Sequence, residues 1–314
     1  MSIDRKGLLA AIEAGGTKFL CAVARPDGQV LDEVRIATTT PAETLGAATD
    51  FFLQTSEAHG PIAALAIGSF GPLSLDPAAA DFGTITTTPK PGWSGTDLVG
   101  HFQHALNVPV TLDTDVNAAA VGEMLFGSGQ GLDCFCYVTV GTGIGVGVVI
   151  GGVPHGGASH PEAGHMRIPR AAGDAGFKGI CPYHGDCLEG MAAGPAMRAR
   201  WGVDAADLPR DHPGWAIEAD YLASLCLNLT YALQPRRIIL GGGVMQAGHL
   251  HGLVRDALSE KLGGYGLNAR TRAMETYIVA PGAGPSAGLT GALALAYRAV
   301  EGRWPGESDW AAPS

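Results

Sequence analysis

Apolar residues along the chain alternate between strand-like and helix-like spacing. Short apolar runs bounded by glycine or proline predict strands, and longer segments with a helical period predict helices. The expected strands are about 8–14, 19–24, 30–37, 64–68, 110–113, 137–140, 145–150, 238–240 and 276–280. The expected helices are about 41–57, 116–126, 217–233, 249–262 and 285–300. Alternation of this kind is typical of layered α/β domains.

One pattern occurs twice. Residues 8–24 and residues 137–150 each predict a strand, a glycine turn and a second strand, followed by alternating elements. We therefore predict two lobes: a small N-terminal α/β lobe over 1–117, and a larger α/β lobe over 118–285. The last helix, about 286–314, packs back on the first lobe in this interpretation. Because ligands favour clefts at domain interfaces, we expect the site between the lobes.

Composition narrows the possible partners. Thirty acidic residues against twenty basic ones give a net charge of −10 at pH 7, which argues against nucleic acid or an anionic membrane as the main partner. Residues 1–6 are polar and lack a secretory signal, so we expect a cytoplasmic protein. Residues 134–153 carry no charge, but their glycines favour two strands over a membrane span. The 47 glycines indicate backbone brought close to a ligand.

The first glycine turn follows Glu13 and contains Gly15, Gly16, Thr17 and Lys18. Backbone amides at such a turn form a nest for an anion, and the Thr17 hydroxyl adds a donor. Glu13 has a carboxylate that is expected to hold Mg²⁺ through water, since this ion keeps several of its waters. A plain hairpin turn is the alternative.

The second turn contains Gly141, Thr142 and Gly143. A strand follows it, so the segment lacks the helix of a dinucleotide fingerprint, and it lacks the lysine of a Walker loop. With two such turns, one in each lobe, we expect the backbone amides of both turns to bind a polyphosphate from opposite sides.

A third glycine run, Gly241, Gly242 and Gly243, ends a predicted strand before a predicted helix. It allows close approach of a flat ring or a phosphate, favoured further by the dipole of the helix N-terminus. A simple strand-to-helix turn is the alternative.

Asp115 lies where a strand becomes a helix. It suits an N-cap, or a general base that takes a proton from a substrate hydroxyl during phosphoryl transfer. Asp113, on the same strand face, is expected to raise the pKa of its neighbour.

Cys181, His184 and Cys187 follow one another at intervals of three. His165 completes a Cys₂His₂ set, with His160 and His155 as less favoured alternatives. A closed tetrahedral set of nitrogen and sulfur ligands indicates structural zinc in an insertion of the larger lobe. The remaining cysteines, Cys21, Cys134, Cys136 and Cys226, are expected to be buried thiols.

Taken in order, these motifs resemble the ROK (repressor, ORF, kinase) family of sugar kinases, with the two-lobed actin/hexokinase-like (ribonuclease H-like) ATPase fold. The resemblance covers about residues 8–299. It implies that 13–18 and 141–145 are phosphate loops, 115–120 the catalytic segment and 240–244 the adenosine loop. Glu162-Ala-Gly-His165 matches the family's sugar motif, in which the glutamate binds sugar hydroxyls and the histidine also ligates zinc.

Two segments resemble the fructokinase branch: residues 87–93, ending in Trp93, and the Cys-Pro-Tyr-His-Gly-Asp-Cys cluster. The family's first loop more often begins with aspartate, so Glu13 departs from that pattern. The resemblance implies ATP-dependent phosphorylation of a hexose, most specifically fructose, with Mg²⁺ and with Asp115 as base. Expected sugar contacts are Asn117, Glu162, His165, Glu189 and Trp93. For Glu189 a surface charge, and for Trp93 a core position, are the alternatives.

Other functions remain open at this stage. Within the family they are glucokinase, mannokinase and N-acetylmannosamine kinase; outside catalysis they are a sugar-binding protein and a sugar-responsive repressor. ROK repressors carry a helix-turn-helix domain before the first loop, and twelve residues before Glu13 are too few for one, so we expect no DNA binding. Family resemblance also implies a homodimer.

Overall fold

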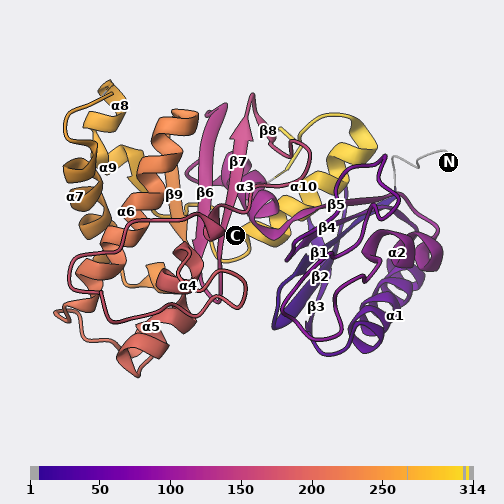
Figure 1. The fold of residues 1–314 in the computed structure, drawn as a ribbon. Coiled ribbons are helices and arrows are strands. Elements are labelled where there is room, and N and C mark those ends of the chain that lie inside the picture. Colours follow the sequence, from indigo (N-terminus) through magenta and orange to yellow (C-terminus); the bar gives the residue numbers. More distant parts are fainter. Residues whose placement is uncertain (1–6, 267, 307–308, 311–314) are drawn as a thin grey trace. The chain divides into compact units, whose positions relative to one another are not determined.

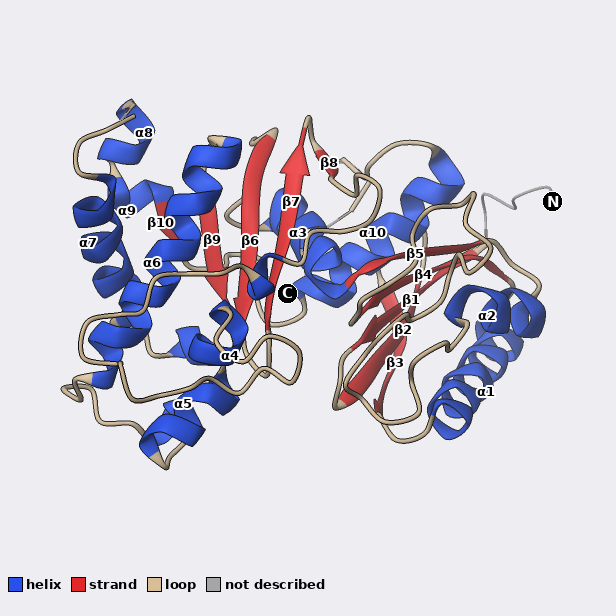
Figure 2. Ribbon diagram, viewed as in Figure 1, coloured by secondary structure: helices blue, strands red, loops and turns tan. Residues whose placement is uncertain are grey.

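The computed structural model describes residues 7–266, 268–306 and 309–310 and has the mixed α/β architecture expected from the sequence (Figures 1 and 2). The polar segment 1–6 and the last four residues of the expected C-terminal segment lie outside the described residues. Backbone contacts divide the chain into two compact units. The first comprises Met1–Gln130, Val153–His160 and Ala283–Ser314, and the second comprises Gly131–Gly152 and Pro161–Gly282.

A five-stranded sheet forms the centre of the first unit. Its order is β3–β2–β1–β4–β5, with β1 antiparallel to β2 and parallel to β4, and with β4 parallel to β5. The strands are β1 Leu8–Ala14, β2 Lys18–Ala24, β3 Val30–Ala37, β4 Ile62–Ser69 and β5 Val110–Thr114. A further two-residue strand, β8 Val153–Pro154, belongs to the same unit.

Helices cover both faces of this sheet (Figure 1). Ala10 and Ile12 of β1 point into a core with α1 Pro41–His59 and α2 Leu98–Leu106. Leu9 and Ala11 point the other way, into a core with α3 Asp115–Phe126 and α10 Ala287–Glu301. The period of two along a buried strand therefore assigns alternate residues to the two layers. Helix α2 was not anticipated from the sequence.

The parallel pairs fix which residues meet at one edge of the sheet. Glu13 of β1 pairs with Gly68 of β4, and Gly68 pairs with Asp113 of β5. One position further on, β1, β4 and β5 end together, since Ala14, Ser69 and Thr114 are also in register. The first glycine turn and the start of α3 consequently leave the same edge of the sheet.

Glycines allow α10 to pack closely against α3. A methyl group on Gly291 of α10 would lie only 1.7 Å from the carbonyl oxygen of Ala118, and one on Gly122 of α3 would lie 2.2 Å from that of Ala287. Helix α10 also contacts β1 and β4. The last helix is thus part of the layer that supports α3.

The second unit is built on strands in the order β10–β9–β6–β7. Its hairpin is antiparallel, while β6, β9 and β10 run parallel. The strands are β6 Cys134–Val140, β7 Ile144–Ile150, β9 Ile238–Gly241 and β10 Ile278–Val279. The helices are α4 Leu188–Ala192, α5 Gly194–Trp201, α6 Gly214–Leu233, α7 Leu250–Leu262, α8 Ala269–Arg272 and α9 Met274–Tyr277, with 3₁₀ turns at Ala163–His165, Ala205–Asp207 and Val244–Gln246.

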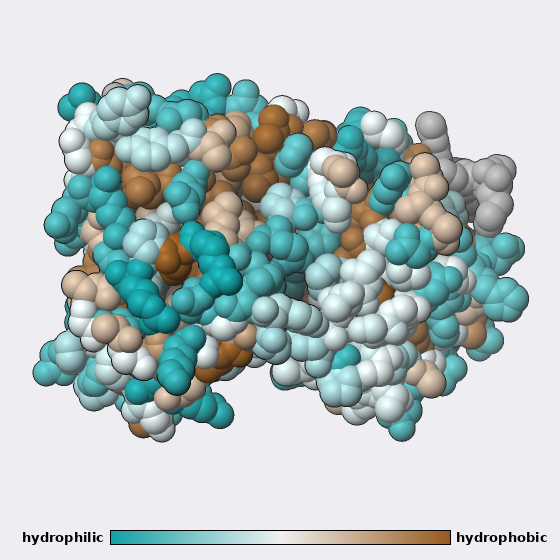
Figure 3. All heavy atoms as spheres, in the orientation of Figure 1, coloured by the Kyte–Doolittle hydropathy of each residue, from teal (hydrophilic) through white to brown (hydrophobic). Residues whose placement is uncertain are grey.

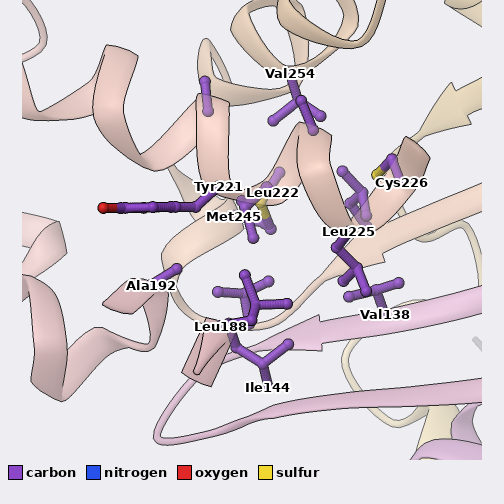
Figure 4. Close-up of a cluster of buried hydrophobic side chains, with 14 of the residues drawn as sticks. Val138, Ile144, Leu188, Ala192, Tyr221, Leu222, Leu225, Cys226, Met245 and Val254 are labelled. Carbon is purple, nitrogen blue, oxygen red and sulfur yellow. The ribbon is translucent and has the colours of Figure 1, made fainter. Parts of the chain in front are cut away.

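One hydrophobic core joins these elements, as Figure 4 shows. Val138 of β6 and Ile144 of β7 face Leu188 of α4 and Leu225 of α6, all almost fully buried. The uncharged segment that begins at Cys134 is therefore a buried hairpin, as predicted. Within the described ranges, no helix has the length and apolar character of a bilayer span.

Two expectations for this unit are wrong. The strand expected at 276–280 is only Ile278–Val279, because residues 274–277 form helix α9. The helix expected at about 249–262 is present as α7, Leu250–Leu262, but the 3₁₀ turn Val244–Gln246 separates it from the glycine run 241–243, so the run does not lead directly into a helix N-terminus as expected. A turn of three residues has almost no dipole, so that part of the phosphate-binding argument for this run does not hold.

The surface gives no sign of an extended apolar patch on the face shown in Figure 3, where hydrophilic residues predominate and hydrophobic ones lie in separate patches. The exposed large apolar side chains among the described residues are scattered along the chain, from Val30 to Tyr265.

The contact between α3 and α10 leads to a prediction about stability. Gly291→Ala places a methyl group against the α3 backbone, and overpacking of this kind costs about 1–3 kcal/mol. Gly46→Ala, in α1 of the same unit, meets no atom within 4 Å and should stabilise by about 0.5–1 kcal/mol, because alanine favours the helix. Denaturant unfolding of both variants is the measurement, and equal stabilities would contradict the close packing.

Candidate functional site

The first glycine turn joins β1 and β2 and is held on both sides. The Gly15 amide donates to the Lys18 carbonyl at 2.9 Å, and the Thr38 hydroxyl donates to the Gly15 carbonyl at 2.8 Å. Lys90 Nζ donates to the Gly16 carbonyl. Gly16 and Thr17 themselves are exposed. The tip of the turn is thus fixed in place while it stays open to an anion.

Glu13 precedes this turn, and its carboxylate lies against Gly288 near the start of α10. Burial raises the pKa of Glu13, while the Lys18 charge lowers it. The Oε2 atom is buried and has no hydrogen-bond partner within the described residues. A buried carboxylate oxygen without a protein partner beside the first glycine turn fits a residue that holds Mg²⁺ through water.

Asp115 is the first residue of α3, and Thr114 is its N-cap. The Thr114 hydroxyl accepts the Asn117 amide, whereas Asp115 Oδ1 accepts the amide of Val116 at 2.9 Å. The N-cap interpretation of Asp115 is therefore wrong. The Asp115 carboxylate is half-buried at the N-terminus of α3, where the helix dipole favours its charged form, and Thr114 supplies the cap in its place.

Asp113 holds Asn117 in place. Its Oδ1 accepts the Asn117 side-chain amide and the Thr114 backbone amide, both at 2.7 Å, and burial raises its pKa. Asn117 is almost fully buried, and its Oδ1 has no protein partner in the described part of the chain. The bond to Asp113 uses one of the two N–H donors of the Asn117 side chain and fixes its orientation, and the side-chain oxygen is left to accept a bond from a ligand.

The second glycine turn joins β6 and β7 and is held from outside by two helices. The Gly141 amide donates to the Gly143 carbonyl at 2.9 Å, and the Gly194 amide of α5 donates to the Gly141 carbonyl at 2.8 Å. From α4, Glu189 Oε2 accepts the Ile144 amide at 3.0 Å. Thr142 at the tip is exposed, as Thr17 is in the first turn.

The third glycine run has a packing reason of its own. Gly242 has a φ of 92° and lies so close to β6 that a methyl group there would come within 2.5 Å of the Val140 backbone. A methyl group on Gly241 would lie 2.7 Å from Pro281. Gly243 is exposed and has no atom near its missing side chain. Gly243 is the most exposed of the three glycines, while Gly242 is half-buried and Gly241 is buried.

Two cysteines and two histidines converge in the second unit. Suitable ligand atoms of His165, Cys181, His184 and Cys187 all lie within 4.8 Å of one another. His165 Nδ1 is 3.4 Å from Cys187 Sγ and 3.7 Å from Cys181 Sγ. This is the donor set and the spacing of a closed tetrahedral metal site.

The two histidines considered as alternative metal ligands, His160 and His155, lie outside the Cys–His cluster. His160 lies in the first unit, where its Nε2 accepts the Leu73 amide at 2.8 Å, and His155 is exposed on the same segment. The four cysteines outside the cluster are free thiols; Cys21, Cys136 and Cys226 are buried as expected, whereas Cys134 is only half-buried.

Two carboxylates face the other nitrogen of His165. Glu162 Oε2 and Glu189 Oε1 each lie 4.0 Å from His165 Nε2. Desolvation, with a smaller contribution from the Glu189 charge, raises the pKa of Glu162 to about 7. The sugar motif of the sequence is thus a real group of polar side chains, and Glu189 belongs to it instead of being a free surface charge.

Trp93 is in the core. Its side chain is fully buried beside Phe19 and Phe70, and its indole N–H donates to the Thr39 carbonyl at 2.9 Å. The burial supports the core alternative and leaves no indole face for a sugar. From the same segment, however, Lys90 reaches the first glycine turn, a role that sequence reasoning missed.

Each of the two sheets carries a glycine hairpin turn, and Asp115 stands at the start of α3, which is the arrangement that the resemblance to sugar kinases of the actin/hexokinase-like fold implies. Solved structures agree. The ROK hexokinase from Thermus thermophilus matches with a TM-score of 0.76 and 27% identity, over 94% of this chain and 100% of its own. The ROK glucokinase from Streptomyces griseus, in complex with glucose and AMPPNP, matches with a TM-score of 0.70 and 26% identity, over 92% and 99%.

The chain belongs to the ROK family, whose model matches residues 9–299, and this confirms the resemblance seen in the sequence. Among curated relatives, the fructokinase from Pediococcus pentosaceus is 46% identical over 94% of this chain and 99% of its own length. The fructokinase from Zymomonas mobilis is 43% identical over 95% and 99%.

Proposed function

We propose that the protein is a fructokinase that transfers the γ-phosphoryl group of ATP to the 6-hydroxyl of D-fructose. The observation that carries this proposal is the 46% identity to a fructokinase over almost the full length of both chains. The glucokinase similarity is much weaker, 28% identity over 40% of this chain for that of Streptomyces coelicolor. Fructose is therefore favoured over glucose as the acceptor.

In this mechanism Asp115 is the general base. Phosphoryl transfer asks a protein mainly to position the reactants and to stabilise charge, and one carboxylate suffices to accept the hydroxyl proton. Asp115 is suited to this because its position is set by the Thr114 cap and the strand register. Asp113 acts through Asn117, which it orients.

The glycine turns provide amide donors to the phosphates. In the first, Gly15, Gly16, Thr17 and Lys18 surround the exposed tip; in the second, Gly141, Thr142 and Gly143 do so. Mg²⁺, when bound, neutralises charge on the transferred phosphate, and Glu13 would hold it through water. The exposed Gly243 is the member of the third run best placed for adenosine.

The sugar contacts are assigned to Glu162, His165 and Glu189, with Asn117 Oδ1 as a further acceptor. A site that hydrogen-bonds sugar hydroxyls discriminates strongly, because the wrong sugar leaves buried polar groups unpaired. The pairing of two carboxylates with one imidazole gives both donors and acceptors for this purpose. We also infer a homodimer located in the cytoplasm.

Zinc is proposed for the His165, Cys181, His184 and Cys187 cluster. Its role is structural, since four protein ligands leave no open position for substrate. By fixing Nδ1 of His165, the ion would orient Nε2 toward Glu162 and Glu189.

A panel of hexoses tests the proposed function. ADP release is measured with fructose, mannose, glucose and N-acetylmannosamine, each with ATP and Mg²⁺. Fructose should give the highest kcat/KM. Preference for glucose would move the protein to the glucokinase branch, and absence of turnover with every sugar would contradict the kinase assignment itself.

Metal analysis tests the zinc proposal. Protein purified without added metal should contain about one zinc per chain, and Cys187→Ser should lose the zinc and lower the Tm, because ligand binding is coupled to folding. Cys134→Ser, a thiol outside the cluster, is the matched control and should retain the metal. A metal-free protein with unchanged Tm and full activity would rule the site out.

A further inference from the structure

Glu189 has one contact that a sugar ligand does not explain. Its Oε2 atom accepts the backbone amide of Ile144 at 3.0 Å, at the point where the second glycine turn enters β7. The same oxygen would lie 2.6 Å from a methyl group on Gly143. The carboxylate therefore fills the space that a side chain at position 143 would need, and it satisfies the first amide after the turn.

The position of Glu189 is firmly set by its surroundings. Helix α4 begins directly after Cys187 of the metal cluster, and the Leu188 side chain packs beside Ile144 in the core (Figure 4). At the other end of α4, Arg200 donates to the Met191 carbonyl at 2.7 Å. Arg200 is held in turn by a buried ion pair with Asp174, at 3.0 Å.

The second oxygen of Glu189 faces a different group. Oε1 lies 4.0 Å from His165 Nε2, and His165 Nδ1 faces the thiol of Cys187. A single carboxylate thus contacts the glycine turn with one oxygen and the imidazole with the other. The two functions that the sequence assigned separately, phosphate binding and sugar recognition, share this side chain.

We propose that Glu189 is a positioning residue for the Gly141–Gly143 turn, and that it links the geometry of this turn to His165. The proposal rests on the function given above, in which this turn binds the phosphates of ATP. It implies that Glu189 supports nucleotide binding even when no sugar is present. A residue that only contacts sugar has no such effect.

A carboxylate is well suited to this task. Hydrogen bonds that an ionised acceptor makes to a backbone amide are about twice as strong as neutral ones, so the turn is held more tightly than by a carbonyl. Aspartate is one methylene shorter and cannot reach both partners from the same helix position. Glutamine keeps the length and an accepting oxygen.

The experiment measures the Kd of AMPPNP with Mg²⁺ by titration calorimetry in the absence of sugar. Glu189→Ala should weaken binding about tenfold, the effect of losing one such hydrogen bond. Glu189→Asp should weaken it by a similar factor, and Glu189→Gln should stay within about threefold of wild type, since its amide oxygen still accepts the Ile144 N–H. Metal content and Tm of each variant report whether the fold is intact.

Glu162→Ala is the matched control, because Glu162 lies at the same distance from His165 Nε2 as Glu189 but belongs to the Glu162–His165 motif and not to α4. It should leave the Kd of AMPPNP unchanged while it raises the KM for fructose. Equal Kd values for Glu189→Ala, Glu162→Ala and wild type would overturn the proposal.

A double-mutant cycle with Gly143→Ala tests the contact itself. The added methyl group displaces Glu189 Oε2, so Gly143→Ala should weaken AMPPNP binding in the wild type and add little in the Glu189→Ala background. Additive losses would mean that the methyl group acts on the nucleotide directly and would overturn the proposed link. If wild-type protein binds no nucleotide, the proposed function fails and this inference fails with it.

Discussion

The register of three parallel strands is the constraint on which the first half of the site depends. Glu13, Gly68 and Asp113 lie in one row across β1, β4 and β5. The middle residue has no side chain, and a methyl group there would come within 2.6 Å of the Ala118 side chain in α3. A shift of one residue would turn these carboxylates to the other face of the sheet. The register of β5 therefore determines the position of Asp115, the residue at which α3 begins.

The second unit repeats the strand–glycine turn–strand plan but supports its turn differently. In the first unit the neighbouring strand and Lys90 hold the turn; in the second, Glu189 of α4 and Gly194 of α5 do so. Helix α4 begins directly after Cys187 of the Cys–His cluster, and its second residue is Glu189, whose carboxylate accepts the Ile144 amide at the end of the turn. The Cys–His cluster, the Glu162–His165 motif and the second glycine turn are thus connected through α4 and Glu189.

Much of the fold and part of the candidate site could be predicted from the sequence, because the patterns that indicate them lie within short segments of the chain. Period and glycine placement predicted both hairpins and the five longest helices, α1, α3, α6, α7 and α10, whereas the shorter α2, α4, α5, α8 and α9 were missed. The spacing of Cys181, His184 and Cys187 predicted a cluster that the fold brings together with His165. The family and the fold class were confirmed by comparison with known proteins.

Predictions from the sequence failed where contacts with residues far away in the chain determine the local structure or the role of a side chain. Thr114 and Asp115 are both good caps, and only the backbone geometry selects Thr114. The glycines at 241 and 242 are explained by their contacts with Pro281 and β6, which no local pattern reveals. Trp93 was equally consistent with core and sugar contact until its neighbours were known. The contact of Glu189 with Ile144 joins residues 45 positions apart and has no sequence signature.

The kinetic comparison of Asp115→Asn with Asp113→Asn tests the central claim most directly. Asparagine at 115 cannot accept the hydroxyl proton, so kcat should fall by about 10²–10⁴ while the Kd for fructose stays within a fewfold of wild type. Asparagine at 113 still accepts the Asn117 amide, so its loss should be much milder. If kcat falls equally in the two variants, or if kcat of Asp115→Asn stays within tenfold of the wild-type value, Asp115 is not the general base and another group accepts the proton.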